Sequence, residues 1–197
     1  MHPADESSEA DKPALRRRFA ASRAARSAAA VHEARSAIAA HVLRVARERS
    51  WTAVAAYIPR PSEPVSVELL DALVGSGIRT VVPVVLDDRD LDWVSWSAAL
   101  PADPMTAPDA QVQRLGLDAI ATVSAVLVPA YAVSAAGVRL GRGGGSYDRA
   151  LARVPAGVTV AAVLFEDEVV PALPADPWDR PVSEVVTPAG WRRIAPE

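Results

Sequence analysis

The chain has 197 residues, of which 50% are hydrophobic and 23% are charged. This composition is ordinary for a globular protein, and the length favours one domain with its own core over two. No apolar run is long enough to cross a membrane, and the polar, acidic N-terminus differs from a secretory signal. Because the chain has no cysteine, disulfide bonds, thiolate metal sites and cysteine nucleophiles are excluded. We therefore expect a soluble, cytoplasmic protein.

The net charge of −3 conceals an uneven distribution of basic residues. Residues 12–49 contain ten basic side chains and two acidic ones, Glu33 and Glu48, so this segment carries a charge of +8. Such a segment can bind nucleic acid or a small ligand that carries phosphate. Phe19 is its only aromatic residue, which leaves few side chains to stack on bases. An RNA-binding protein therefore remains an alternative, and a small phosphate-bearing ligand fits better.

The N-terminal part of the chain predicts a tail followed by helices. Residues 1–11 are polar and are expected to be a disordered tail, and residues 12–197 are expected to form a single domain. The segment 12–49 is rich in alanine and arginine and predicts one or two helices. Pro13 suits a first helical turn, where its missing N–H costs nothing.

The rest of the chain alternates between short apolar runs and helical patterns. Buried strands are expected over 53–58, 80–86, 125–129, 158–164 and 183–187, and a more exposed, alternating strand over 91–96. Helices are expected over 65–74 and from about residue 147, and 97–124 is rich in loops. Continuous apolar strands that alternate with helices indicate a mostly parallel sheet. The predicted fold is a single α/β domain, a three-layer sandwich with a mostly parallel central sheet and helices on both faces.

A glycine-rich segment, residues 139–149 with the sequence RLGRGGGSYDR, is the most informative part of the chain. Its three consecutive glycines leave backbone amides uncovered, so the loop can form an anion-binding nest ahead of a helix N-terminus. Arg139 and Arg142 flank the loop with guanidinium groups suited to phosphate oxygens. Asp148 could hold a magnesium ion that bridges those phosphates. The spacing matches neither a Walker loop nor a dinucleotide-binding fingerprint.

Residues 127–149 closely resemble the signature of the 5-formyltetrahydrofolate cyclo-ligase family. In words, this signature is valine-proline, a small apolar stretch, glycine, arginine-leucine-glycine, a glycine-rich loop and tyrosine-aspartate-arginine. Residues 12–16 are similar to the family's N-terminal lysine-x-x-leucine-arginine. Residues 57–65, with Glu63, resemble its folate-side segment, and 178–187 resemble its C-terminal segment. The four pieces occur in the family's order and span nearly the whole chain.

The resemblance implies an ATP-dependent enzyme that cyclises 5-formyltetrahydrofolate to 5,10-methenyltetrahydrofolate and releases ADP and phosphate. The formyl oxygen would attack the γ-phosphate of ATP to give a phosphorylated imine, which the second folate nitrogen closes. Such chemistry asks the protein mainly for positioning and charge stabilisation. The implied cofactors are ATP and Mg²⁺. We expect a monomer that acts on small molecules, with no nucleic acid or membrane as partner.

The resemblance also implies the residues of the site. The implied catalytic residues are Arg142, Tyr147 and Asp148, and the implied magnesium ligands are Asp148 and Asp179. The implied ATP-binding residues are Lys12, Arg16, Arg139, Leu140, Gly141, Arg142, Gly143, Gly144, Gly145, Ser146 and Tyr147. The implied substrate-binding residues are Ile58, Glu63, Trp96, Arg142, Gly143, Gly144, Gly145 and Ser146. Glu63 would bind the polar edge of the pterin, and Tyr147 with Trp93 or Trp96 would stack on a flat ring.

Other interpretations of the same residues remain open. Without the resemblance, Lys12 and Arg16 would be solvated helix charges, and Glu63 and Asp179 would be turn carboxylates. The chain also departs from the family pattern at three serines, since an aspartate is common at positions 134 and 183 and an aromatic residue at 146. A degenerate paralogue that binds folate or nucleotide without turnover is therefore one alternative. A sugar-phosphate isomerase or CoA transferase of similar fold is another.

Overall fold

Seven strands form the central sheet, in the order β10-β9-β7-β4-β1-β2-β3. The computed structural model describes residues 6–97, 100 and 112–194. The strands are β1 (Ala53–Ala55), β2 (Arg79–Val85), β3 (Leu91–Ser95), β4 (Ala125–Pro129), β7 (Thr159–Val163), β9 (Glu184–Thr187) and β10 (Gly190–Arg193). The five strands from β9 to β2 pair in parallel, and β3 and β10 close the edges in antiparallel pairing. The predicted mostly parallel sheet is confirmed.

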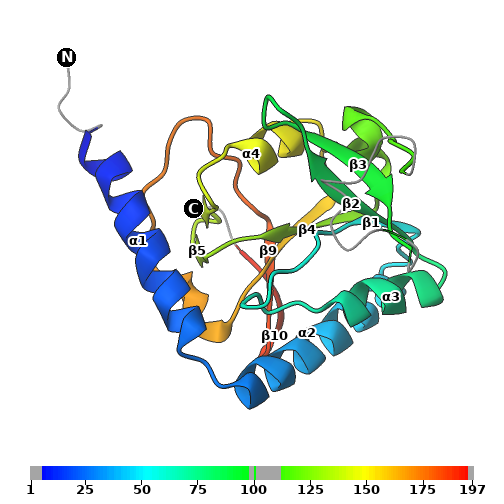
Figure 1. Ribbon diagram of the computed structural model, residues 1–197, viewed down its shortest axis with the longest axis horizontal. Coiled ribbons are helices and arrows are strands. Elements are labelled where there is room, and N and C mark those ends of the chain that lie inside the picture. Colours follow the sequence, from blue (N-terminus) through cyan, green and yellow to red (C-terminus); the bar gives the residue numbers. More distant parts are fainter. Residues whose placement is uncertain (1–5, 98–99, 101–111, 195–197) are drawn as a thin grey trace.

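Helices cover both faces of this sheet (Figure 1). α2 (Ala28–Glu48) and α3 (Val67–Gly75) bury apolar side chains such as Ile38 and Leu70 against one face. The 3₁₀-helix η2 (Leu117–Thr122) and α4 (Ser146–Leu151) cover the other, with Ile120 and Leu151 in its core. The three predicted layers are therefore confirmed. β3 is more buried than expected, because Trp93 lies fully inside the second of these cores.

A second, three-stranded sheet was not predicted from the sequence. It consists of β5 (Ala132–Ser134), β6 (Arg139–Leu140) and β8 (Val169–Val170), in the order β6-β5-β8. Strands of two or three residues are too short to show a period in the sequence. Ser134 starts the β5–β6 turn: its Oγ accepts a hydrogen bond from the Val138 amide at 3.1 Å. This contact explains how a serine can replace the aspartate that is common in the family, since both side chains accept such a bond.

α1 (Glu6–Ala24) lies against the second sheet and away from the central one (Figure 1). Phe19 packs with Ala132 and Leu140 there. The helix begins six residues earlier than expected, so residues 6–11, predicted as tail, are helical, and residues 1–5 lie outside the described part. A run without proline or glycine and with an acidic first residue favours this earlier start. Pro13 therefore lies inside the helix and not in its first turn.

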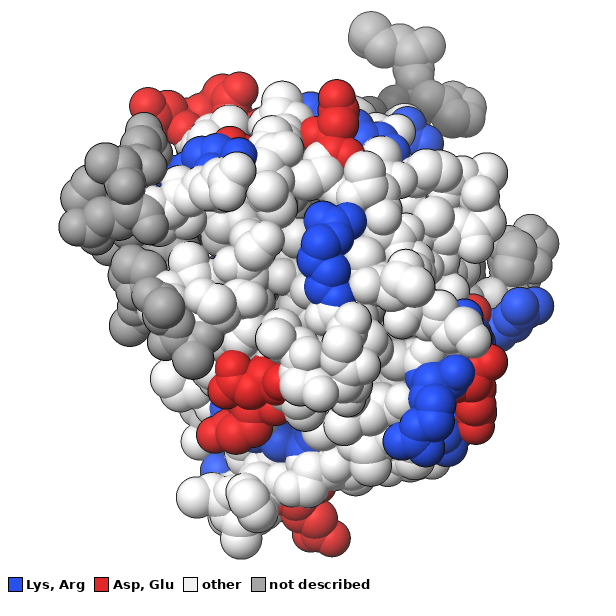
Figure 2. All heavy atoms as spheres, turned by 90° about the vertical axis from the view of Figure 1, so that its right-hand side faces the viewer, with Lys and Arg blue, Asp and Glu red and all other residues white. Residues whose placement is uncertain are grey.

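The space-filling view shows the side of the molecule that lies at the right of Figure 1, where β3 and α3 are found (Figure 2). Among the described residues on that side, charged groups are scattered between uncharged ones and form no continuous basic patch. No helix within the described part of the chain has the length and apolarity to span a bilayer.

Candidate functional site

A cavity of about 900 Å³ opens between α1, the central sheet and the glycine-rich loop. Val85 at the end of β2 and Pro129 at the end of β4 line it, so it lies at the carboxyl ends of parallel strands. Ligands of open α/β sheets bind at this edge. Lys12 and Arg16 from α1 form another wall. Basic side chains of α1 thus face the carboxyl edge of the sheet.

The glycine-rich loop runs over residues 141–145, between β6 and α4. Gly143 and Gly145 have φ values of +92° and +69°, which glycine adopts without strain. Arg16 packs on the loop: its Nε donates to the Gly141 carbonyl at 2.8 Å. A Cβ at position 143 would lie 3.1 Å from the Arg16 guanidinium carbon. Glycine is needed here both for the backbone path and for the close approach of an arginine.

Arg139 and Asp148 form an ion pair beside this loop. Nη2 of Arg139 lies 2.8 Å from Oδ1 of Asp148, which also accepts a hydrogen bond from the Arg180 amide at 3.3 Å. The Arg139 guanidinium lies 5.7 Å from the centre of the Tyr147 ring. Burial raises the pKa of Tyr147, so its hydroxyl stays protonated at neutral pH. Asp148 therefore lies at the cavity wall with its charge paired to that of Arg139.

Lys12 reaches from α1 to a tight turn over residues 176–179. Its Nζ lies 2.5 Å from Oδ2 of Asp176 and 2.8 Å from Oδ2 of Asp179. Burial lowers the pKa of Lys12, but its contacts with the two aspartates outweigh that effect, so the net shift is upward. Lys12 is therefore not a solvated helix charge. Asp176 was missed by sequence reasoning, although the pattern aspartate-proline-tryptophan-aspartate signals the turn.

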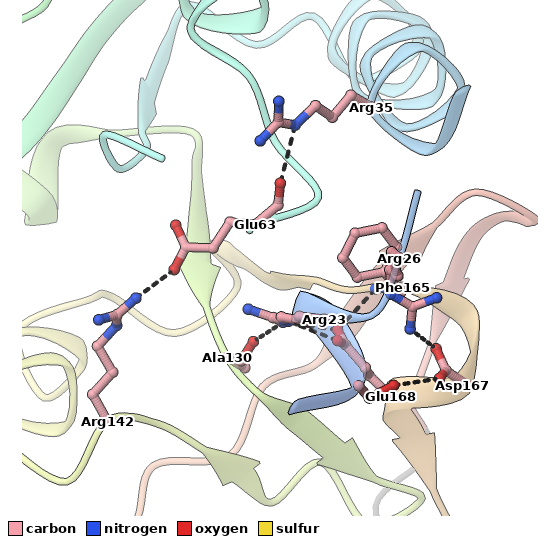
Figure 3. Close-up of polar contacts among 10 residues, drawn as sticks. Arg23, Arg26, Arg35, Glu63, Ala130, Arg142, Phe165, Asp167 and Glu168 are labelled. Carbon is pink, nitrogen blue, oxygen red and sulfur yellow. Dashed lines mark hydrogen bonds and ion pairs between the residues drawn. The ribbon is translucent and has the colours of Figure 1, made fainter. Parts of the chain in front are cut away.

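Glu63 lies in the loop after β1, buried at the cavity wall (Figure 3). Arg35 of α2 holds the loop, since its Nε donates to the Glu63 carbonyl at 3.1 Å. The Glu63 carboxylate also closes the loop, with Oε2 accepting from the Arg60 amide at 2.8 Å. The other oxygen, Oε1, lies 3.1 Å from Nη2 of Arg142. A carboxylate fixed in this way presents one oxygen to the arginine of the glycine-rich loop.

A buried ion pair that the sequence did not reveal fixes the C-terminal half of α1 (Figure 3). Nε and Nη2 of Arg23 donate to Oε1 and Oε2 of Glu168 at 2.7 and 2.8 Å, and Nη2 also donates to the Ala130 carbonyl at 2.6 Å. The side chains of Arg23 and Glu168 are only 2% and 0% exposed. Nearby, Nη2 of Arg26 lies 2.5 Å from Oδ1 of Asp167. Arg23 lies four residues after Phe19, on the same helix face, and this was the signal available in the sequence.

The Tyr131 ring connects α1 with the glycine-rich loop. The guanidinium carbon of Arg23 lies 5.3 Å from its centre, and that of Arg142 lies 5.9 Å from it. All three residues line the cavity. Tyr131 therefore contacts both an arginine of α1 and the arginine of the glycine-rich loop.

The model of the 5-formyltetrahydrofolate cyclo-ligase family matches residues 8–188. The chain belongs to this family. It is therefore assigned to the folate ligases of one-carbon metabolism. A relative from Mycolicibacterium smegmatis, named 5-formyltetrahydrofolate cyclo-ligase, is 37% identical over 145 residues, which are 71% of this chain and 75% of the relative.

Two solved structures of 5,10-methenyltetrahydrofolate synthetases are similar to the cyclo-ligase chain. The one from Mycoplasma pneumoniae has a TM-score of 0.74 at 21% identity, with 90% of this chain and 99% of that one covered. The one from Aquifex aeolicus has a TM-score of 0.71 at 25% identity, with 94% of each chain covered. The similarity to the Mycoplasma pneumoniae structure shows that the two proteins share a fold.

Most of the residues that the resemblance implied for the cyclo-ligase site meet in the cavity. Its lining includes Lys12, Arg16, Glu63, Arg139, Leu140, Gly141, Arg142, Gly143, Gly144, Gly145, Ser146, Tyr147, Asp148 and Asp179. Ile58 and Trp96 are not among the lining residues, and both pack against the core under α2 and α3. The indole N–H of Trp96 donates to Asp71 of α3 at 2.8 Å. Trp93, the other tryptophan expected to stack on a ring, is fully buried.

The two aspartates expected to bind magnesium are not part of a larger cluster of acidic or histidine side chains within the described residues. Among the described residues, no three aspartate, glutamate or histidine side chains converge as a cluster able to hold a metal ion. Asp148 and Asp179 line the same cavity, and each is paired with a cation of the chain. Magnesium is usually held by one or two carboxylates together with substrate phosphates and water. A pair of cavity carboxylates without a third protein ligand fits that pattern.

Proposed function

We propose that this enzyme converts 5-formyltetrahydrofolate to 5,10-methenyltetrahydrofolate at the expense of ATP, with release of ADP and phosphate. The observation that carries the proposal is the meeting of two kinds of group in one cavity. Basic side chains and glycine amides suited to phosphate lie on one part of its wall, and the buried Glu63 carboxylate lies on another. Family membership supports both assignments.

The nucleotide would lie along α1 and the glycine-rich loop. Arg16 already contacts the loop backbone, and the loop adds amides on glycines with positive φ. We propose that Lys12, Arg16, Arg139 and Arg142 contact the triphosphate, together with the backbone of residues 140–147. α4 has only six residues, so the arginines and loop amides, and not a helix dipole, would supply most of the positive potential.

Asp148 and Asp179 are proposed to hold magnesium. Their donor set consists of oxygens alone, which suits a hard cation. When bound, the ion would neutralise phosphate charge and orient the triphosphate. The contribution of the chain itself is to hold Asp148 through Arg139 and the Arg180 amide, and Asp179 through Lys12.

The folate is proposed to bind with its pterin edge at Glu63. The Arg60 amide fixes the carboxylate, and Arg35 holds the loop through the Glu63 carbonyl, so the carboxylate would accept ring N–H groups without much loss of side-chain entropy. Arg142, which contacts Glu63, would stand between the two substrates, beside the transferring phosphoryl group. Tyr147, whose hydroxyl stays protonated and is buried beside Arg139, would help to orient that group.

In the proposed reaction, the formyl oxygen attacks the γ-phosphorus, and ADP leaves. The product is a phosphorylated imine whose carbon is activated. The second folate nitrogen then adds to that carbon and loses its proton to the solvent or the departing phosphate, and phosphate leaves with the former formyl oxygen. The side chains named above orient the two substrates, stabilise charge on the transferring group and keep water away from the reactive imine.

Mixing the protein with ATP, Mg²⁺ and 5-formyltetrahydrofolate should produce the absorbance of methenyltetrahydrofolate. Omission of ATP should abolish the rise, and one ADP should form per folate cyclised. Binding of both substrates without any product would contradict the proposal and favour a degenerate paralogue. Turnover of a sugar phosphate without folate would favour the isomerase alternative.

A further inference from the structure

Trp178 differs from the other tryptophans in its position. Trp51 and Trp93 are buried and Trp96 and Trp191 are partly buried, whereas Trp178 is 67% exposed. A single exposed apolar residue is common on protein surfaces and needs no explanation by itself. Trp178, however, is among the residues that line the cavity of the proposed active site.

The backbone beneath Trp178 is held rigidly. The Asp179 amide donates to the Asp176 carbonyl at 3.0 Å, which closes a four-residue turn with Pro177 at its second position and Trp178 at its third. The Asp176 amide in turn donates to Oδ2 of Asp179 at 2.9 Å. Lys12 clamps both carboxylates from α1. An exposed indole therefore stands on a turn that is fixed before any ligand arrives.

A rigid turn that presents an exposed indole at a ligand cavity has the form of a stacking platform. A flat ring that stacks on the indole would bury apolar area, and the turn would lose little entropy because it is already ordered. Two aromatic systems are offered by the proposed substrates, the adenine of ATP and the rings of the folate. The contacts of the turn favour adenine. Lys12 and Asp179 are residues proposed for the triphosphate and its magnesium, and the neighbouring Arg180 amide binds Asp148.

We propose that Trp178 forms the base subsite of this enzyme and stacks on the purine ring of the nucleotide. The inference rests on the proposed use of ATP. The subsite takes a planar, uncharged heteroaromatic ring, and it is separate from the groups that contact phosphate. Because the subsite binds the base and not the phosphates, Trp178 should contribute to the affinity for nucleotides and not to the affinity for inorganic polyphosphates.

The test compares Trp178→Leu with Trp178→Phe by calorimetry in the presence of Mg²⁺. The probes are a non-hydrolysable ATP analogue, inorganic tripolyphosphate and 5-formyltetrahydrofolate. Trp178→Leu should weaken the ATP analogue about ten-fold, within the range that base–aromatic stacking gives, and leave the other two probes unchanged. Trp178→Phe, which keeps a ring, should lose only about two- to three-fold. The control is Val74→Ala, which trims another exposed apolar residue, 42% exposed on α3 and not among the cavity-lining residues.

Three outcomes would overturn the proposal. Equal weakening of tripolyphosphate would mean that Trp178 acts through the turn and not by stacking. Weakening of the folate alone would assign the indole to the other substrate, and unchanged binding of all three probes would make it an ordinary surface residue. The proposed function fails separately: wild-type protein that binds the analogue through Trp178 and yields no methenyltetrahydrofolate would contradict the reaction and leave the base subsite intact.

Discussion

Arg142 and Glu63 contact each other across the cavity, with Nη2 and Oε1 3.1 Å apart (Figure 3). One residue belongs to the glycine-rich loop proposed for the nucleotide, and the other to the loop proposed for the pterin. The Arg142 side chain is 40% exposed, so the pair itself contributes little to stability. Its consequence is that Oε1 of Glu63 has an arginine as partner before folate arrives. In the proposed complex, the pterin edge and Arg142 therefore compete for this oxygen.

Glu63→Gln should weaken binding of 5-formyltetrahydrofolate about ten- to a hundred-fold. A pterin edge offers adjacent N–H donors, and the amide would place an N–H against one of them. The loss corresponds to about 1.5–3 kcal/mol for hydrogen bonds to a charged group. The loop should keep its shape because an amide oxygen can still accept from the Arg60 amide. Calorimetry with folate and with a non-hydrolysable ATP analogue gives the two affinities.

The affinity for the ATP analogue should change far less in the same variant. Glu48→Gln is a matched control, since this carboxylate is exposed at the end of α2. Unchanged folate affinity in Glu63→Gln would make Glu63 a loop carboxylate only, and the pterin would have to bind elsewhere.

Asp148→Asn should lower kcat about ten- to a hundred-fold, the range expected from the loss of support around a metal site. Excess chelator should inhibit the wild-type enzyme equally. The asparagine keeps an oxygen toward Arg139 and the Arg180 amide, so the fold should survive. Asp148→Ala should melt at a lower temperature than Asp148→Asn, because it leaves the buried Arg139 guanidinium without that acceptor. Full activity in chelator would contradict the magnesium assignment.

The sequence predicted the parallel strands of the central sheet well because they are apolar runs, as over 125–129. It missed the edge strand β10 (Gly190–Arg193), which contains two arginines and is no apolar run. The sequence also predicted the glycine-rich loop, because consecutive glycines indicate a backbone with positive φ, and Gly143 and Gly145 have such values. It did not predict the second sheet, whose strands are too short to show a pattern. Nor did it predict the Arg23–Glu168 pair, because the partners are 145 residues apart and only the fold brings them together. The resemblance implied Trp96 as a substrate-binding residue, but in the structure Trp96 packs beside α3.

Lys12→Ala should raise the KM for ATP much more than the KM for folate and should also lower the melting temperature. The loss of stability follows from the two carboxylates that Lys12 holds, at about 1.5 kcal/mol for a hydrogen bond to a charged group. A solvated lysine on a helix surface would cause no such loss of stability when it is replaced by alanine. Arg17→Ala is the matched control, since Arg17 is exposed on the same helix. Steady-state kinetics and thermal denaturation check both effects, and equal KM changes for the two substrates would contradict the assignment to ATP.

Arg23→Met should destabilise the protein by about 3–5 kcal/mol, because it leaves the fully buried Glu168 carboxylate without its partner. Adding Glu168→Gln should recover part of the loss, since the amide is uncharged and its oxygen can still accept from the Phe165 amide. Denaturant unfolding of both single variants and the double variant measures the coupling. A double variant no more stable than Arg23→Met would mean that the arginine acts through packing on Tyr131 and Phe165 and not through the charge.

The deficit of Arg23→Met should also depend on pH. Burial raises the pKa of Glu168 in the wild type, and Arg23 opposes that shift. Without the arginine the folded-state pKa rises further above the unfolded value, so the native protein takes up a proton more readily. The sign follows from linkage: stability is gained as pH falls through the folded pKa and lost as pH rises through it. Arg23→Met should therefore approach the wild-type stability on acidification from neutral pH, whereas Arg23→Met with Glu168→Gln should show no such approach. A deficit that stays constant between neutral and mildly acidic pH would contradict a buried charge as its cause.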